Sequence, residues 1–96
     1  MPLDDSVREM VVIASKIFSA NTRKFYGAYL GYYPDNPGSP VIYFLIPGLS
    51  DFGIDMALAE FEINILAQTG KSIPVRRLKL NAEEAKSCGY LTECLK

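Results

Sequence analysis

The chain begins with apolar residues spaced as on one face of an amphipathic helix. Ser6 and Glu9 form a capping-box pair, and Asp4 and Asp5 place negative charge where the helix begins. We therefore predict a helix that is capped at Ser6 and ends near Ala20. Its apolar face comprises Val7, Met10, Val11, Ala14, Ile17 and Phe18, and its water-facing side comprises Arg8, Ser15, Lys16 and Ser19.

Two runs of strand-forming residues follow, at 25–33 and 41–46. The segment between them, 34–40, consists of Pro, Asp, Asn, Gly and Ser, which are typical of turns. We predict a β-hairpin with a seven-residue loop. The second run is apolar at every position, which indicates a central strand covered on both faces.

A longer helical pattern runs from Asp51 to Thr69, with Ser50 as its cap and Gly70 as its stop. At about 100° per residue, its apolar positions divide into two stripes on nearly opposite sides. The first stripe comprises Ile54, Leu58, Phe61 and Ile65, and the second comprises Phe52, Met56, Ile63 and Ala67. A helix that is apolar on two sides needs two surfaces to pack against.

Residues 73–80 are typical of a third strand, 81–89 of a short capped helix, and 90–96 of a tail or final turn. The resulting order is α-β-β-α-β-α, in which the second strand, the long helix and the third strand form a β-α-β unit. We predict an α+β fold with a three-stranded mixed sheet packed with helices. We expect residues 1–96 to form a single domain.

Composition narrows the chemistry of this chain. Its 96 residues include no histidine, which removes the commonest general base and zinc ligand. Five residues separate Cys88 from Cys94, a spacing that fits neither zinc nor redox motifs. With no secretory signal and no apolar run long enough for a membrane span, we expect a cytoplasmic protein with reduced thiols. We expect no catalytic residue, cofactor or metal.

Two features could bind an ion, but for each of them a structural role is the better explanation. The turn 46–51 joins a strand to a helix N-terminus and could hold an anion, but it lacks a glycine-rich cradle and a following lysine. Asp51, Asp55 and Glu62 share one helix edge and could contribute oxygens to Mg²⁺. Such widely spaced carboxylates do not converge without a second element, so we interpret them as a solvated edge.

The apolar surface is larger than a small three-stranded sheet can cover. We therefore predict a small non-enzymatic protein-interaction or regulatory module, which forms a homodimer and also binds another protein. The expected interface residues are Phe52, Met56 and Ile63 on the long helix and Tyr29 and Tyr33 on the first strand.

A second hypothesis is a protein that binds single-stranded nucleic acid. Arg76, Arg77 and Lys79 make the third strand basic, and the tyrosines of the first strand offer stacking platforms. Basic residues on an edge strand also protect it against pairing with another sheet. The formal charge of −1 gives no overall attraction for nucleic acid, so this hypothesis ranks second.

Overall fold

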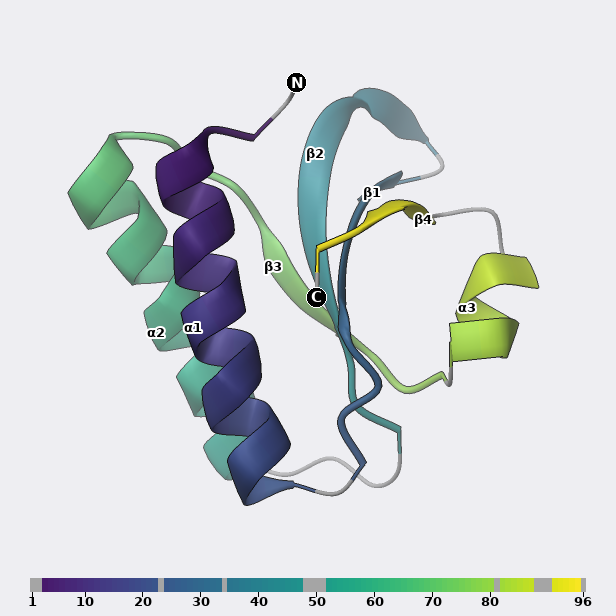
Figure 1. Ribbon diagram of the computed structural model, residues 1–96. Helices are drawn as coiled ribbons and strands as arrows, with labels where there is room; N and C mark the ends of the chain where they lie inside the picture. The colour runs from purple at the N-terminus through teal and green to yellow at the C-terminus, as the bar shows by residue number, and fades with distance from the viewer. Residues whose placement is uncertain are drawn as a thin grey trace.

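The structure is a computed structural model that describes residues 3–22, 24–33, 35–47, 52–80, 82–87 and 91–95. Its elements in chain order are α1 (Asp5–Asn21), β1 (Ala28–Tyr33), β2 (Asn36–Leu45), α2 (Phe52–Thr69), β3 (Val75–Leu78), α3 (Ala82–Ser87) and β4 (Leu91–Cys94). The predicted α+β class is confirmed (Figure 1).

The sheet has four strands in the order β3-β2-β1-β4. β1 pairs antiparallel with β2 and β4, while β2 pairs in parallel with β3, the strand that follows α2. The prediction of three strands and a C-terminal tail was therefore wrong, because residues 91–94 add a strand beside β1. This segment is too short to show its own periodicity, and its pairing with β1 defines it.

The predicted seven-residue hairpin loop was also wrong. β2 begins at Asn36, which pairs with Tyr33, and Pro40 pairs with Tyr32. The register shifts between Tyr32 and Tyr33. Proline tolerates extended backbone and edge or bulged positions, so the turn-forming composition of 36–40 did not exclude a strand.

Both long helices begin and end near the predicted residues. The N-cap of α1 is Asp4, whose side chain makes no capping hydrogen bond, so the Ser6 capping box was wrong. Instead, the carboxylate of Asp4 accepts a hydrogen bond from Lys71 Nζ. At the end of α2, Gly70 has a φ of 73° and donates its N–H to Leu66 O, as expected for a glycine stop. The predicted cap Ser50 lies outside the described residues.

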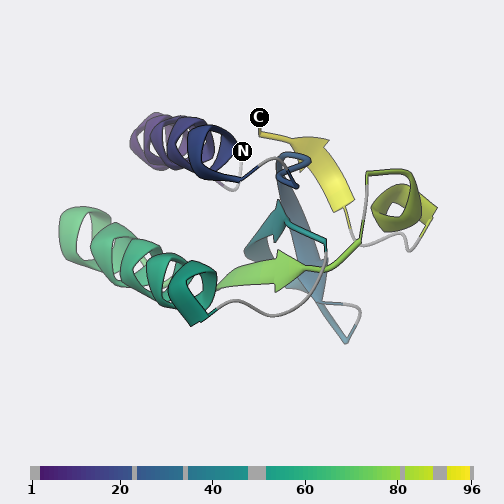
Figure 2. The ribbon, with the colours of Figure 1, turned by 90° about the horizontal axis from the view of Figure 1, so that it is seen from below.

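Helices α1 and α2 lie side by side, antiparallel, against one face of the sheet, and α3 lies on the other (Figures 1 and 2). The core on the α1–α2 side is centred on Phe44, whose ring packs against the rings of Phe18, Phe25 and Phe61. Every residue from Val41 to Ile46 is buried. The prediction of an internal second strand covered on both faces is therefore confirmed.

Ser15 departs from the prediction that it faces water. It is 1% exposed, and its Oγ has no hydrogen-bond partner among the described residues. Because Ala has the higher helix propensity and leaves no polar atom unpaired, we expect Ser15→Ala to raise the free energy of unfolding by about 0.5–1 kcal/mol. Urea denaturation measures the change. A lower stability for the variant would show that this hydroxyl forms a stabilising bond.

An ion pair joins α1 to β4. Both Nη atoms of Arg8 donate to the carboxylate of Glu93, each at 2.9 Å. These hydrogen bonds from Arg8 hold the pKa of Glu93 below its ordinary value. The stabilisation from this pair is therefore present above the ordinary carboxyl pKa and is lost as the pH falls through the lowered one.

We expect Glu93→Gln to melt at a lower temperature than wild type near neutral pH, and the difference to shrink as the pH falls below the ordinary carboxyl pKa. Thermal melts across this range measure it. A difference that is constant with pH would contradict a role for the Glu93 charge.

Candidate protein-interaction surface

The predicted second stripe of α2 is exposed. Phe52, Met56 and Ile63 have 79%, 48% and 64% of their surface exposed. On the opposite side of the same helix, Leu58 and Ile65 are buried against the sheet. The predicted division of α2 into a core side and an outer apolar side is therefore confirmed.

The outer apolar side extends beyond the predicted residues. Leu66 is 49% exposed and Ala59 is also exposed, so Phe52, Met56, Ala59, Ile63 and Leu66 form what we call the outer stripe. Successive members are separated by four, three, four and three positions. This alternation is the spacing of residues that meet a second helix in a coiled coil. It was present in the sequence, but the predicted second stripe included Ala67, which is also exposed, and did not include Ala59 and Leu66.

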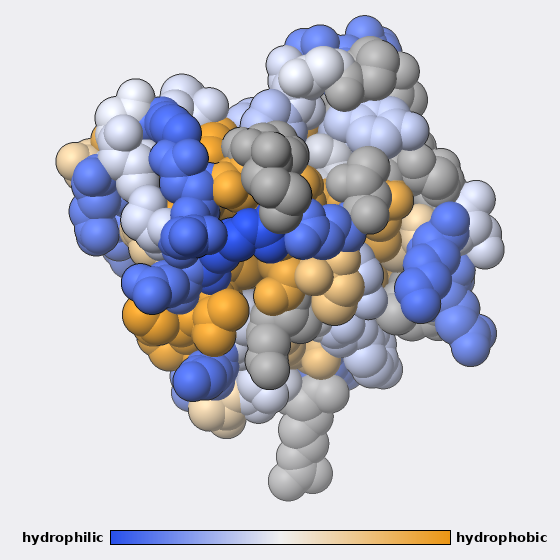
Figure 3. All heavy atoms as spheres, turned by 45° about the horizontal axis from the view of Figure 1, so that its top comes forward, coloured by the Kyte–Doolittle hydropathy of each residue, from blue (hydrophilic) through white to orange (hydrophobic). Residues whose placement is uncertain are grey.

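Helix α1 adds apolar surface to the same layer. Ile13 and Ile17 are 60% and 58% exposed. Ile17 was predicted on the apolar face of its helix, but α2 does not cover it. On the helical side of the molecule, Figure 3 shows apolar surface next to charged side chains.

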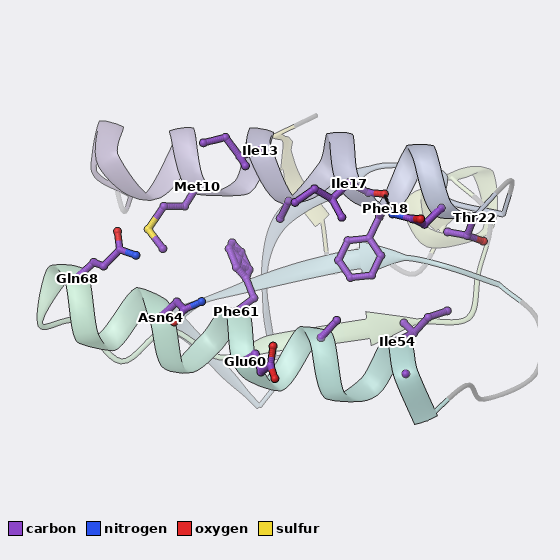
Figure 4. Close-up of a pocket in the computed structure, with 14 residues that line it drawn as sticks. Met10, Ile13, Ile17, Phe18, Thr22, Ile54, Glu60, Phe61, Asn64 and Gln68 are labelled. Atoms are coloured by element: carbon purple, nitrogen blue, oxygen red, sulfur yellow. Dashed lines mark hydrogen bonds between the residues drawn. The ribbon is translucent and has the colours of Figure 1, made fainter.

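A cavity of about 680 Å³, open to solvent, lies between α1 and α2, which also contact each other. Phe18 of α1 and Phe61 of α2 point into it from opposite helices (Figure 4). Glu60, Asn64 and Gln68 line its α2 side with polar groups. The cavity was not predicted, because it depends on the separation of two helices that lie far apart in the sequence.

The predicted tyrosine surface does not form at Tyr29. This residue is 9% exposed and belongs to a second core cluster with Tyr43, Val41, Leu45 and Ala85 of α3. Burial raises the pKa of its hydroxyl. Tyr29 therefore packs on the face of the sheet that α3 covers. The Tyr33 side chain lies outside the described part of the structure.

The basic residues of the nucleic-acid hypothesis make intrachain contacts. Arg76 Nη1 donates to Glu62 Oε1 and to Val75 O, both at 2.9 Å, and Arg77 Nε donates to Ile46 O at 2.9 Å. Lys79 is exposed beyond the end of β3. Two of the three predicted basic residues therefore donate hydrogen bonds to backbone carbonyls, Arg76 to Val75 in β3 and Arg77 to Ile46 next to it.

Glu62 protects the β3 edge. Its Oε1 accepts the N–H of Val75 at 2.7 Å as well as the Arg76 guanidinium. These contacts occupy the outward N–H and carbonyl of Val75, groups that an exposed edge strand otherwise offers to another sheet. The predicted solvated edge of α2 was therefore incomplete, because one of its carboxylates has this structural role.

The remaining candidate chemistry is limited. Among the described residues, no group of three or more His, Cys, Asp or Glu side chains could hold a metal ion. Asp51 and most of the 46–51 turn lie outside those residues, as does Cys88. Cys94 has a free, exposed thiol.

No helix in the described ranges has the length and apolar character needed to cross a membrane. No protein-family model, curated protein or solved structure matches this chain.

Proposed function

We propose that this chain is a small non-enzymatic protein-interaction module whose binding surface is the α1–α2 layer. The outer stripe of α2 carries the proposal. Its four large apolar side chains are each about half exposed or more, although the opposite side of the helix is in the core. Contiguous apolar surface on a small domain is typical of a site that another macromolecule covers.

The α1–α2 layer exposes apolar side chains that a partner would bury. Burying a large apolar side chain contributes roughly 1.5–3 kcal/mol, and association costs roughly 4–15 kcal/mol in rigid-body freedom. Six large side chains contribute to the layer, namely Ile13, Ile17, Phe52, Met56, Ile63 and Leu66. This exposed apolar surface supports the proposal, whereas the buried Tyr29 adds no surface to the layer.

Self-association remains a prediction from the sequence. Sedimentation at protein concentrations spanning about 100-fold separates a homodimer from a monomer. A homodimer on this layer should dissociate in Met56→Lys, which remains folded because Met56 is exposed. A wild-type monomer throughout this range would exclude the homodimer and leave a different protein as the partner.

Photo-crosslinking in the cells that produce the protein tests the wider proposal. A photoreactive amino acid replaces Met56 in one variant and Ser87, which is exposed on α3, in the control. We expect a discrete crosslinked product from position 56 and none from position 87. Equal products from both positions, or none from position 56, would contradict the proposal.

A further inference from the structure

The outer stripe has the geometry of a surface that receives a helix. Its spacing of four and three positions aligns Phe52, Met56, Ala59, Ile63 and Leu66 along α2. In helix pairs, residues spaced in this way insert between side chains of the facing helix. From Phe52 to Leu66 the stripe extends for about 21 Å, enough for roughly four helical turns of a partner.

The charges that α2 itself places beside the stripe are acidic. Helix α2 contains Asp55, Glu60 and Glu62 and no lysine or arginine. On the Asp55 side, Arg76 and Arg77 of β3 line a hollow with Asp55 and Ala59, where they donate hydrogen bonds to Glu62 Oε1 and Ile46 O. Arg76 pairs with Glu62, whereas Asp55 and Glu60 are exposed on opposite sides of the stripe. A helix with lysine or arginine beside its own apolar residues would place opposite charges next to both carboxylates.

These charges also distinguish between occupants. On the Glu60 side of the stripe, the space between α1 and α2 is lined by no described lysine or arginine, so two copies of α2 that faced each other would bring Glu60 near the acidic residues of the second helix without a compensating cation, and like charges at such positions are unfavourable. A second copy is therefore a poorer match for the stripe than a basic helix.

We propose that the outer stripe binds an amphipathic helix of another protein, with basic residues flanking its apolar residues. This rests on the proposed function and specifies its partner. The apolar stripe provides the buried area, and Asp55 and Glu60 select the charge of the partner.

Two synthetic helical peptides of about 20 residues test this inference. Both carry the same apolar heptad positions, flanked by lysine in one and by glutamate in the other. Each peptide repels copies of itself. Fluorescence anisotropy gives their Kd values at about 50 mM salt and again at about 500 mM.

We expect the lysine peptide to bind wild type about tenfold more tightly than the glutamate peptide at low salt, and less than threefold more tightly at high salt. Ile63→Lys should weaken binding of both peptides by at least about tenfold. The double substitution Asp55→Asn and Glu60→Gln should remove most of the preference, whereas Glu83→Gln on α3 should leave it unchanged.

Each other outcome overturns the inference in a distinguishable way. Equal binding of both peptides would contradict the charge selection but leave the proposed function standing. No binding by a wild-type protein that sediments as a dimer, together with dissociation of that dimer in Met56→Lys, would assign the stripe to a second copy. No binding by a wild-type monomer would overturn the helix partner, and crosslinking at position 56 would then decide the proposed function separately.

Discussion

Phe44→Ala is expected to lower the free energy of unfolding by about 3–5 kcal/mol. Phe44 is completely buried in β2, and its ring makes edge-to-face contacts with Phe18 and Phe61 at centroid distances of 5.3 and 5.7 Å. Truncation removes these contacts and leaves a cavity between the sheet and both helices. Because a domain of this size is stable by only about 5–15 kcal/mol, much of the stability would be lost.

Guanidinium denaturation monitored by circular dichroism measures this loss. Phe52→Ala provides a matched control, because the same side chain is removed from a position that is 79% exposed. We expect the control to change stability by no more than about 0.5 kcal/mol. Similar losses for both variants would contradict the placement of Phe44 in the core and Phe52 outside it.

Lysine substitutions at Ile63 and Ile65 should have opposite consequences. Ile65 is completely buried against the sheet, so Ile65→Lys places an unpaired charge in the core and should unfold the protein. Ile63 is two residues away and 64% exposed, so Ile63→Lys should stay folded. It should nevertheless lose partner binding by at least about tenfold, because a charge then interrupts the outer stripe.

Thermal melts and binding measurements on the two variants test this contrast. Unfolding of Ile63→Lys would show that the outer stripe is needed within the chain itself. Folded Ile63→Lys with unchanged affinity would show that the partner binds elsewhere.

The long helices could be predicted because their periodicity extends over several turns. The two stripes of α2 can be distinguished from the angular positions of their residues around the helix axis. Gly70 marks the end of the helix. β4 and the first part of β2 could not be predicted in this way. β4 depends on its pairing with β1. Within 36–40, whose composition is typical of turns, Asn36 and Pro40 pair with β1.

The candidate surface was predicted in part. Phe52, Met56 and Ile63 are exposed together as the helical pattern indicated. Tyr29 is not, because α3 and its neighbours form a second core cluster that strand composition does not reveal. The exposure of Ile17 depends on the distance between α1 and α2, which is a property of tertiary packing.

The most direct test of the central claim is the alkylation rate of a cysteine placed in the outer stripe. Ala59→Cys provides this cysteine and Ser87→Cys the control, both in a background with Cys88 and Cys94 replaced by serine. In dilute purified protein, we expect both cysteines to react at similar rates, since both positions are exposed. In the cells that produce the protein, Ala59→Cys should react at least about tenfold more slowly than Ser87→Cys, because a partner covers the stripe. Equal rates in the cells would contradict the account.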